Sequence, residues 1–211
     1  FHAGELRVLL LIAKYSVHWA LPGGLTGIDE DIDLCAQRIL QVRTGLSDIY
    51  LQQFKVFGQA KRATQSKNQK ILKELGIKSE KGWMFERFVT VGYYALVDFS
   101  KVNATPDDFS SACEWFNVYG LPGLMLDHAE IVASALGFIR QQLNYHPIGY
   151  NLLPEKFTMP DLQKLYETIL GRTLDRRNFQ RKMLSVGILK RLPEKKVGLT
   201  HKAPYYYKFD M

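Results

Sequence analysis

The feature that most constrains the fold is a glycine-rich loop that leads into one amphipathic helix, between Trp19 and Leu46. Pro22 and several glycines interrupt the chain after a short β-prone run, and apolar residues then recur at helical spacing over residues 31–44. Gly45 ends this pattern. The stretch therefore predicts a strand, a loop, a helix and a second loop, in that order. The helix side chains expected to face the core are those of Ile32, Cys35, Ala36, Ile39 and Leu40.

This stretch resembles a Nudix box. In the pattern of that family, a glycine is followed by a glutamate, then by an arginine, and finally by a second glycine, with a group of acidic residues around the arginine. The residues in register with this pattern are Gly24, Glu30, Arg38, Leu40, Gly45 and Leu46. The acidic positions are occupied here by Ile39, Val42 and Arg43. The chain thus keeps the two glycines of the box, Gly24 and Gly45, and lacks its acidic group.

The substituted positions decide the chemistry that the resemblance implies. Their spacing places the side chains on one face of the helix, where carboxylates would bind magnesium. Ile39 and Val42 have no ligand atoms, and Arg43 carries a permanent positive charge. We therefore predict that the Nudix domain is catalytically degenerate: the chain is not an enzyme and has no catalytic residue, metal or cofactor. Glu30, together with its acidic neighbours, is interpreted as an acid that complements the dipole at the helix start.

A Nudix hydrolase that acts on a nucleoside diphosphate derivative such as ADP-ribose is the alternative. Such an enzyme would need carboxylates from elsewhere in the chain to hold its metal. The candidates are Glu80, Glu86 and Glu114. Multiple turnover of ADP-ribose in the presence of magnesium would favour the hydrolase.

Length and composition narrow the class of protein. A chain of 211 residues suffices for one large domain or two small ones. It contains no apolar run near the ~20 residues of a membrane span, so no membrane partner is expected. Cys35 and Cys113 lie far apart without a Cys-x-x-Cys spacing, which argues against a disulfide framework or a zinc site. These observations favour a cytoplasmic protein.

Outside the box, β-prone runs are followed by one further helix. Strands are expected over residues 5–12, 49–58, 87–97 and 111–119, and a helix over residues 129–143. The Nudix resemblance implies one more strand ahead of the first of these. His128 stands beside Asp127 at the start of the helix, where it contacts a ligand or a neighbouring carboxylate, or takes part in a capping arrangement.

The net charge of +7 is concentrated in the last third of the chain. Residues 145–211 contain thirteen Lys and Arg against six Asp and Glu, whereas residues 1–144 contain fifteen of each. This segregation predicts a basic surface and a polyanionic partner for the C-terminal part.

The basic segment also has the pattern of a helix-turn-helix. Thr158 is an N-cap signal ahead of a proline, apolar residues follow at helical spacing, and Gly171 ends the helix. A second helix is expected over residues 176–184, and residues 187–209 have the pattern of two strands around a basic loop, which is a wing. The inward-facing residues of the second helix are expected to be Phe179, Met183 and Leu184. Helix, short turn, helix and wing together favour DNA binding.

The residues expected to contact DNA are polar or basic and lie on the second helix or on the wing. On the helix they are Arg176, Arg177, Asn178, Arg181 and Lys182, and on the wing they are Lys195, Lys196 and Lys202. The start of the second helix reaches base edges in helix-turn-helix proteins, whereas lysines on a wing contact phosphates.

This C-terminal part resembles the winged helix-turn-helix of Nudix-related transcriptional regulators. The similarity rests on the runs at residues 147–154, 157–163 and 175–179, and it covers nearly the whole chain outside residues 59–86. It implies an α+β fold: a Nudix α/β/α sandwich over residues 1–144 that senses an effector, followed by a winged helix-turn-helix over residues 145–211. It also implies a repressor that binds double-stranded operator DNA as a homodimer.

The resemblance leaves two classes of effector. The family includes repressors of NAD biosynthesis that sense ADP-ribose, and sugar-responsive regulators such as arabinose-utilisation repressors, and the resemblance is closer to the sugar-responsive branch. An ADP-ribose-like nucleotide would need basic contacts, for which the candidates are Arg43, Lys61, Arg62 and Arg87. A sugar would need a carboxylate and aromatic faces, for which the candidates are Glu30, Trp83 and Trp115. The insertion at residues 59–86 is either a lid over the effector or a surface elaboration.

Overall fold

The computed structural model describes residues 4–14, 17–47, 49–60, 62, 88–98, 104–106, 110–143, 152–196 and 203–210. The chain divides into two compact units. The box unit comprises Arg7–Ala95 and Val102–Phe138, and the C-terminal unit comprises Phe1–Leu6, Leu96–Lys101 and Ile139–Met211. The insertion at residues 59–86 lies almost wholly outside the described residues. The domain boundary after residue 144 stays a prediction.

The first sheet of the box unit has the strand order β2-β1-β5, with antiparallel pairing. Its strands are β1 (Arg7–Ala13), β2 (Trp19–Ala20) and β5 (Ser110–Asn117). β1 takes the central place because its leucine run is apolar on both faces: Leu9, Leu10 and Leu11 are all buried. Leu10 forms a core cluster with Leu124 and Val132. The strands predicted over residues 5–12 and 111–119 thus lie side by side, as β1 and β5.

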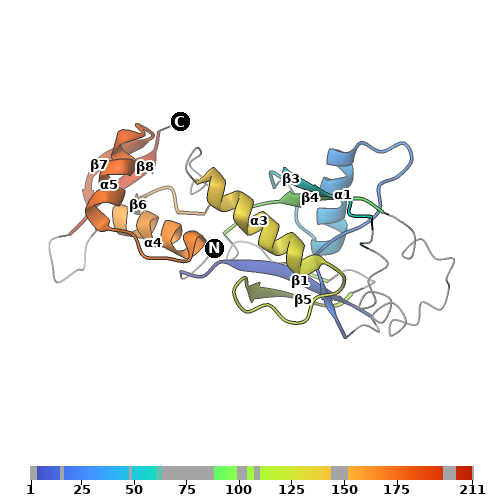
Figure 1. Cartoon of the computed structure of the whole chain (residues 1–211). Coiled ribbons are helices and arrows are strands. Elements are labelled where there is room, and N and C mark those ends of the chain that lie inside the picture. Colours follow the sequence, from blue (N-terminus) through green and yellow to red (C-terminus); the bar gives the residue numbers. More distant parts are fainter. Residues whose placement is uncertain are drawn as a thin grey trace. The chain divides into compact units, whose positions relative to one another are not determined.

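The second sheet of the box unit is a pair of antiparallel strands. They are β3 (Gln52–Phe57) and β4 (Thr90–Tyr94). Figure 1 shows β3 beside β4 and, below them, β1 beside β5. Aromatic rings pack on the sheet, since the ring centroid of Phe138 lies 6.2 Å from that of Phe54 and 5.8 Å from that of Tyr94. Both strands were predicted and are confirmed with shorter bounds.

The described helices of the box unit are α1 (Ile32–Thr44) and α3 (His128–Gln142), and α3 continues into the C-terminal unit from Ile139. α1 ends where predicted, because Gly45 adopts a φ of 72° and donates its N–H to Gln41 O at 2.8 Å. Its buried face is narrower than predicted. Cys35 is 3% exposed, but Ile32 is 43% exposed. Ile32 lies in the first turn of α1, whose residues 32–34 are all exposed, so its assignment to the core was wrong.

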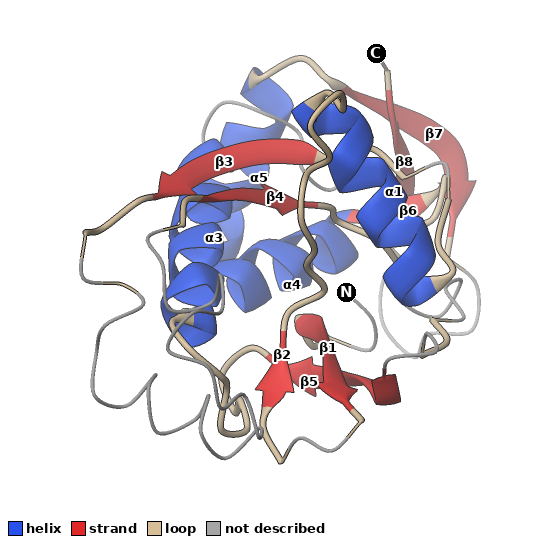
Figure 2. Ribbon diagram, turned by 90° about the vertical axis from the view of Figure 1, so that its right-hand side faces the viewer, coloured by secondary structure: helices blue, strands red, loops and turns tan. Residues whose placement is uncertain are grey.

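Among the described residues, the C-terminal unit holds two complete helices and a sheet in the order β6-β8-β7 (Figure 2). The helices are α4 (Met159–Leu170) and α5 (Arg176–Ser185), and the strands are β6 (Phe157–Thr158), β7 (Leu189–Lys195) and β8 (Tyr205–Phe209). Two helices followed by a β-hairpin confirm the predicted winged helix-turn-helix. The tip of the wing, residues 197–202, lies outside the described residues.

Local caps set the bounds of α4. The Thr158 side chain accepts a hydrogen bond from Asp161 N, and Asp161 Oδ2 accepts one from Thr158 N at 2.9 Å, which completes a capping box. Gly171 ends the helix with a φ of 70°. Both signals were read from the sequence and are confirmed. No helix among the residues described is both long and apolar enough to cross a membrane.

The core of the C-terminal unit forms between α4 and its neighbours. Leu165 and Ile169 of α4 are fully buried, and Phe179 and Met183 of α5 are each 5% exposed. Leu184 is 44% exposed, so its predicted inward orientation was wrong. Successive residues of a helix point about 100° apart, and Met183 already occupies the position that faces the core.

Candidate nucleic-acid interface and effector site

The outer face of α5 presents basic and amide groups to solvent. Asp175 caps the helix by accepting a hydrogen bond from Asn178 N at 2.8 Å. On the inner face, the ring of Phe179 lies 5.3 Å from that of Tyr166 in α4. All the predicted contact residues of this helix are exposed, and they are Arg176, Arg177, Asn178, Arg181 and Lys182. A helix of this kind, with no acidic residue, suits a polyanionic surface.

Asn178 and Arg181 are bonded to each other. Arg181 Nη2 donates a hydrogen bond to Asn178 Oδ1 at 2.9 Å. The sequence predicts an outward position for both residues but not this bond. Their spacing of three residues was the available signal, because side chains three apart on a helix are neighbours.

On the wing, two cations share one aromatic ring. The Arg191 guanidinium carbon lies 3.9 Å from the ring centroid of Tyr205, and Lys195 Nζ lies 4.8 Å from it. Lys195 is a predicted contact residue, and Arg191 is not among the residues predicted from the sequence. Lys196 Nζ lies 3.7 Å from Asp161 Oδ1, so the charge of Lys196 is partly compensated by the start of α4. Lys202 lies outside the described residues.

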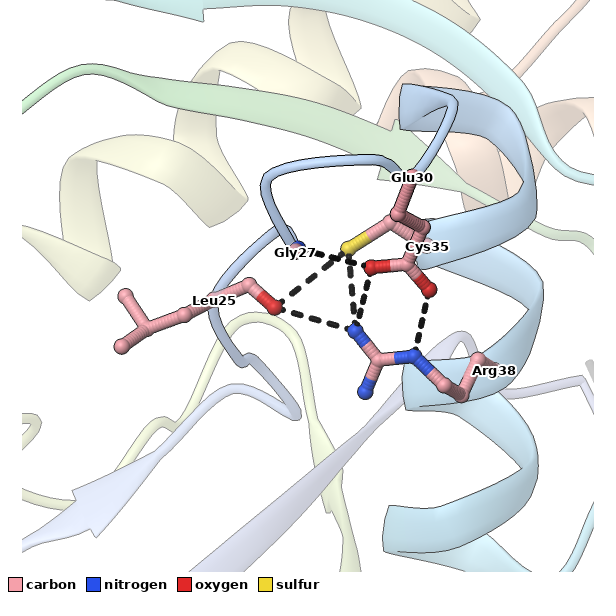
Figure 3. A network of polar contacts seen from close by, with 5 residues as sticks. All are labelled: Leu25, Gly27, Glu30, Cys35 and Arg38. Atoms are coloured by element: carbon pink, nitrogen blue, oxygen red, sulfur yellow. Dashed lines mark hydrogen bonds and ion pairs between the residues drawn. The ribbon is translucent and has the colours of Figure 1, made fainter.

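In the box unit, an ion pair closes the loop ahead of α1 (Figure 3). Arg38 donates from Nε to Glu30 Oε1 at 2.5 Å and from Nη2 to Glu30 Oε2 at 2.7 Å. Arg38 Nη2 also donates to Leu25 O at 3.0 Å, and Glu30 Oε2 accepts from Gly27 N at 2.9 Å. The bonds from Arg38 are the main cause that lowers the pKa of Glu30 to about 2. The carboxylate interpreted as a helix-start acid is therefore paired with Arg38, and it holds the loop in shape.

The positions that lack acids tie α1 to the same loop. A Cβ on Gly24 would lie 2.9 Å from Ile39 Cγ1, so the Ile39 side chain rests against the glycine. Arg43 Nε donates to Gly23 O at 3.1 Å, and Val42 is 55% exposed. Within the described ranges, no group of three or more His, Cys, Asp or Glu side chains is arranged to hold a metal ion.

The structure locates three of the predicted effector residues. Glu30 and Arg43 both contact the loop over residues 23–30. Trp115 lies in β5, where it pairs in register with Leu9 and is partly buried. Trp83 and Arg87, like Lys61, lie outside the described residues.

Two other candidate residues have tertiary partners that the sequence did not reveal. Arg62, considered for an effector phosphate, is 5% exposed and pairs instead with Asp127, with an Nη2 to Oδ1 distance of 2.7 Å. His128 Nδ1 accepts a hydrogen bond from Leu21 N at 2.9 Å. Burial lowers the pKa of His128 to about 4, so the ring is neutral at pH 7. Both side chains therefore hold the box unit together.

The family of the NrtR DNA-binding winged helix domain matches residues 149–209. An ADPR responsive transcriptional repressor of Acinetobacter baylyi, NtrR, is 30% identical over 210 residues, which cover 96% of this chain and 76% of that protein. The chain belongs to the NrtR family of transcriptional regulators.

Solved structures have the same NrtR fold. The crystal structure of Shewanella oneidensis NrtR complexed with a 27mer DNA superposes with a TM-score of 0.72 at 23% identity, over 100% of this chain and 89% of that chain. A MutT/nudix family protein from Enterococcus faecalis superposes with a TM-score of 0.71 at 20% identity, over 99% of this chain and 81% of that chain. The predicted α+β fold, a Nudix domain followed by a winged helix-turn-helix, is confirmed, and so is the prediction of a DNA-binding regulator of transcription.

Proposed function

We propose that this NrtR regulator represses transcription by binding operator DNA through α5 and the wing, and that an ADP-ribose-like effector in the Nudix domain changes its affinity for the operator. The observation that carries the proposal is the row of exposed basic and amide side chains on α5, within the segment that matches the NrtR DNA-binding winged helix domain. Residues 1–144 act as the sensor and residues 145–211 as the reader. The chain works as a homodimer in the cytoplasm, where two readers engage a palindromic operator.

The relative from A. baylyi favours ADP-ribose over a sugar, because that repressor is named as ADPR responsive. A diphosphate requires positive charge, and Arg43 supplies it beside the box loop, where its Nε contacts Gly23 O at 3.1 Å. Arg87, Trp83 and Trp115 are proposed to complete the site with a second cation and with aromatic faces. Glu30 contributes by holding the loop through Arg38.

The sensor binds its effector without hydrolysing it. Ile39 rests on Gly24 and Arg43 on Gly23, at positions where the Nudix pattern has acidic residues that bind magnesium. Replacing Ile39, Val42 and Arg43 together by Glu restores ligand atoms but also removes both contacts with the loop. We expect this triple variant to gain no efficient hydrolysis of ADP-ribose.

The experiment combines binding and turnover on the full chain. A duplex selected from a random library is titrated at several salt concentrations, alone and with ADP-ribose, NAD or arabinose. We expect operator binding that weakens with salt, and an affinity that changes with ADP-ribose but not with arabinose. A response to arabinose alone would show that the effector is a sugar and not ADP-ribose. Rapid magnesium-dependent turnover of ADP-ribose would show that the chain is a hydrolase. Sedimentation of the protein alone tests the dimer.

A further inference from the structure

Asn178 and Arg181 stand one helical turn apart on the exposed face of α5, and they are bonded before any DNA is present. The distance from Arg181 Nη2 to Asn178 Oδ1 is 2.9 Å. The backbone of Asn178 is itself fixed, because its N–H is held by the N-cap Asp175 at 2.8 Å. The backbone of Asn178 therefore has a defined position in the first turn of the helix, and the bond from Arg181 orients its side-chain acceptor.

The bond between Arg181 and Asn178 leaves the two side chains with different capacities to contact a base edge. An arginine has five donors in a planar fork, and the fork matches the N7 and O6 acceptors of guanine. An asparagine reads adenine when its Oδ1 and Nδ2 face the base together, with Oδ1 accepting from N6 and Nδ2 donating to N7. The Oδ1 of Asn178 is turned toward Arg181, away from the arrangement that an adenine contact requires.

We infer that Asn178 is a positioning residue, which holds the Arg181 guanidinium for a bidentate contact with guanine and does not itself read adenine. The inference rests on the proposed role of α5 as the reader of the operator. Its physical basis is preorganisation: an exposed arginine loses many rotamers when it binds, and a hydrogen bond that already restricts the side chain reduces this entropic cost. Arg181 and Asn178 thus determine one base pair of the operator together.

The test selects duplexes from a random library with the full chain and with the variants Arg181→Ala, Asn178→Ala and Asn178→Asp. Arg181→Ala should lose the preference for guanine at one base pair, by about tenfold to a hundredfold. Asn178→Ala should weaken the preference at that same base pair, and the double alanine variant should lose no more than Arg181→Ala alone. Asn178→Asp keeps the acceptor, so it should keep the guanine preference even though its negative charge lowers the affinity for all DNA.

Arg177→Ala is the matched control, because it removes the same charge from a neighbouring position whose side chain does not face Asn178. Its effect should add to that of Asn178→Ala. The inference is overturned if Asn178→Ala changes the preference at a different base pair, or if its effect adds to that of Arg181→Ala. If Arg181→Ala leaves every base preference intact, the proposed role of α5 as the reader fails as well. Because the substituted side chains are exposed, thermal unfolding should match the unmodified chain.

Discussion

Arg62, which is buried, and Asp127, which is partly buried, lie 65 positions apart in the chain and form an ion pair in the box unit. Arg62 also donates from Nη1 to Thr90 Oγ1 at 2.6 Å and to Phe57 O at 3.2 Å. Its guanidinium lies over the ring of Phe88, 4.8 Å from the centroid. One side chain thus joins the end of β3, the start of β4 and the start of α3.

Removal of one partner of this pair should be costly. Asp127→Ala leaves a buried guanidinium without its counter-charge, and we expect a loss of about 3–5 kcal/mol in the free energy of unfolding. The double variant Arg62→Met with Asp127→Leu should lose less, because no charge stays buried. Urea unfolding measures both. The exposed pair Lys156 and Glu194 is the control, and its loss should change stability by less than about 1 kcal/mol. A loss of less than about 1 kcal/mol from Asp127→Ala would contradict the structural role of the pair.

The neutral ring of His128 should make stability depend on pH. Its pKa is about 4 in the folded chain, below the value of 6.5 for a free histidine, because burial disfavours the charged form. The unfolded chain therefore binds the extra proton first as the pH falls. The contribution of the neutral His128 ring to the free energy of unfolding is fully present above about pH 6.5 and is lost as the pH falls toward 4. The free energy of unfolding falls by at most about 1.4 kcal/mol per pH unit in this range.

His128→Asn separates this titration from the hydrogen bond. The Asn Oδ1 can take the place of Nδ1 as the acceptor for Leu21 N, but it does not titrate. We expect urea unfolding at pH 7, 6 and 5 to show a shallower loss of stability in this variant than in the unmodified chain. Equal pH dependence in the two proteins would assign the effect to another group.

Gly24 and Ile39 should behave as a coupled pair. A Cβ on Gly24 would approach Ile39 Cγ1 to 2.9 Å, closer than a normal contact, so Gly24→Ala should cost about 1–3 kcal/mol of stability. Ile39→Ala removes the obstructing atoms and should offset part of that cost in the double variant. Unfolding of both single variants and the double variant gives the coupling. Additive losses would mean that α1 can move away from the loop at Gly24 without a cost in free energy.

The ring of Tyr205 should matter for DNA affinity although it carries no charge. It holds Arg191 and Lys195 on the wing, and each exposed contact of this kind contributes about 0.5–1 kcal/mol. Tyr205→Leu should weaken operator and scrambled duplex to the same degree, because phosphate contacts carry no sequence information. Tyr205→Phe keeps the ring and should bind as the unmodified chain does. A selective loss of operator binding in Tyr205→Leu would indicate a role in reading bases.

Local signals in the sequence determined the bounds of the helices and the basic character of residues 145–211. Thr158 acts through its side chain, and Gly45 and Gly171 act through their backbone, each on near neighbours in the chain, so their roles as caps were predictable from a few consecutive residues. The segregation of charge into the last third required only counting. Sequence periodicity was less reliable for single side chains, as Ile32 and Leu184 show, because a helical repeat does not state how wide the covered face is.

Tertiary structure alone decided which polar groups became partners. Arg62 was a candidate for an effector phosphate until the fold brought Asp127 against it, and His128 was a candidate ligand or cap until its Nδ1 met Leu21 N, 107 residues away. The side chain of an arginine or a histidine is equally suited to a ligand or to a distant backbone group. Its role depends on what the folded chain places within hydrogen-bond distance, and pairing over such separations leaves no periodic trace in the sequence.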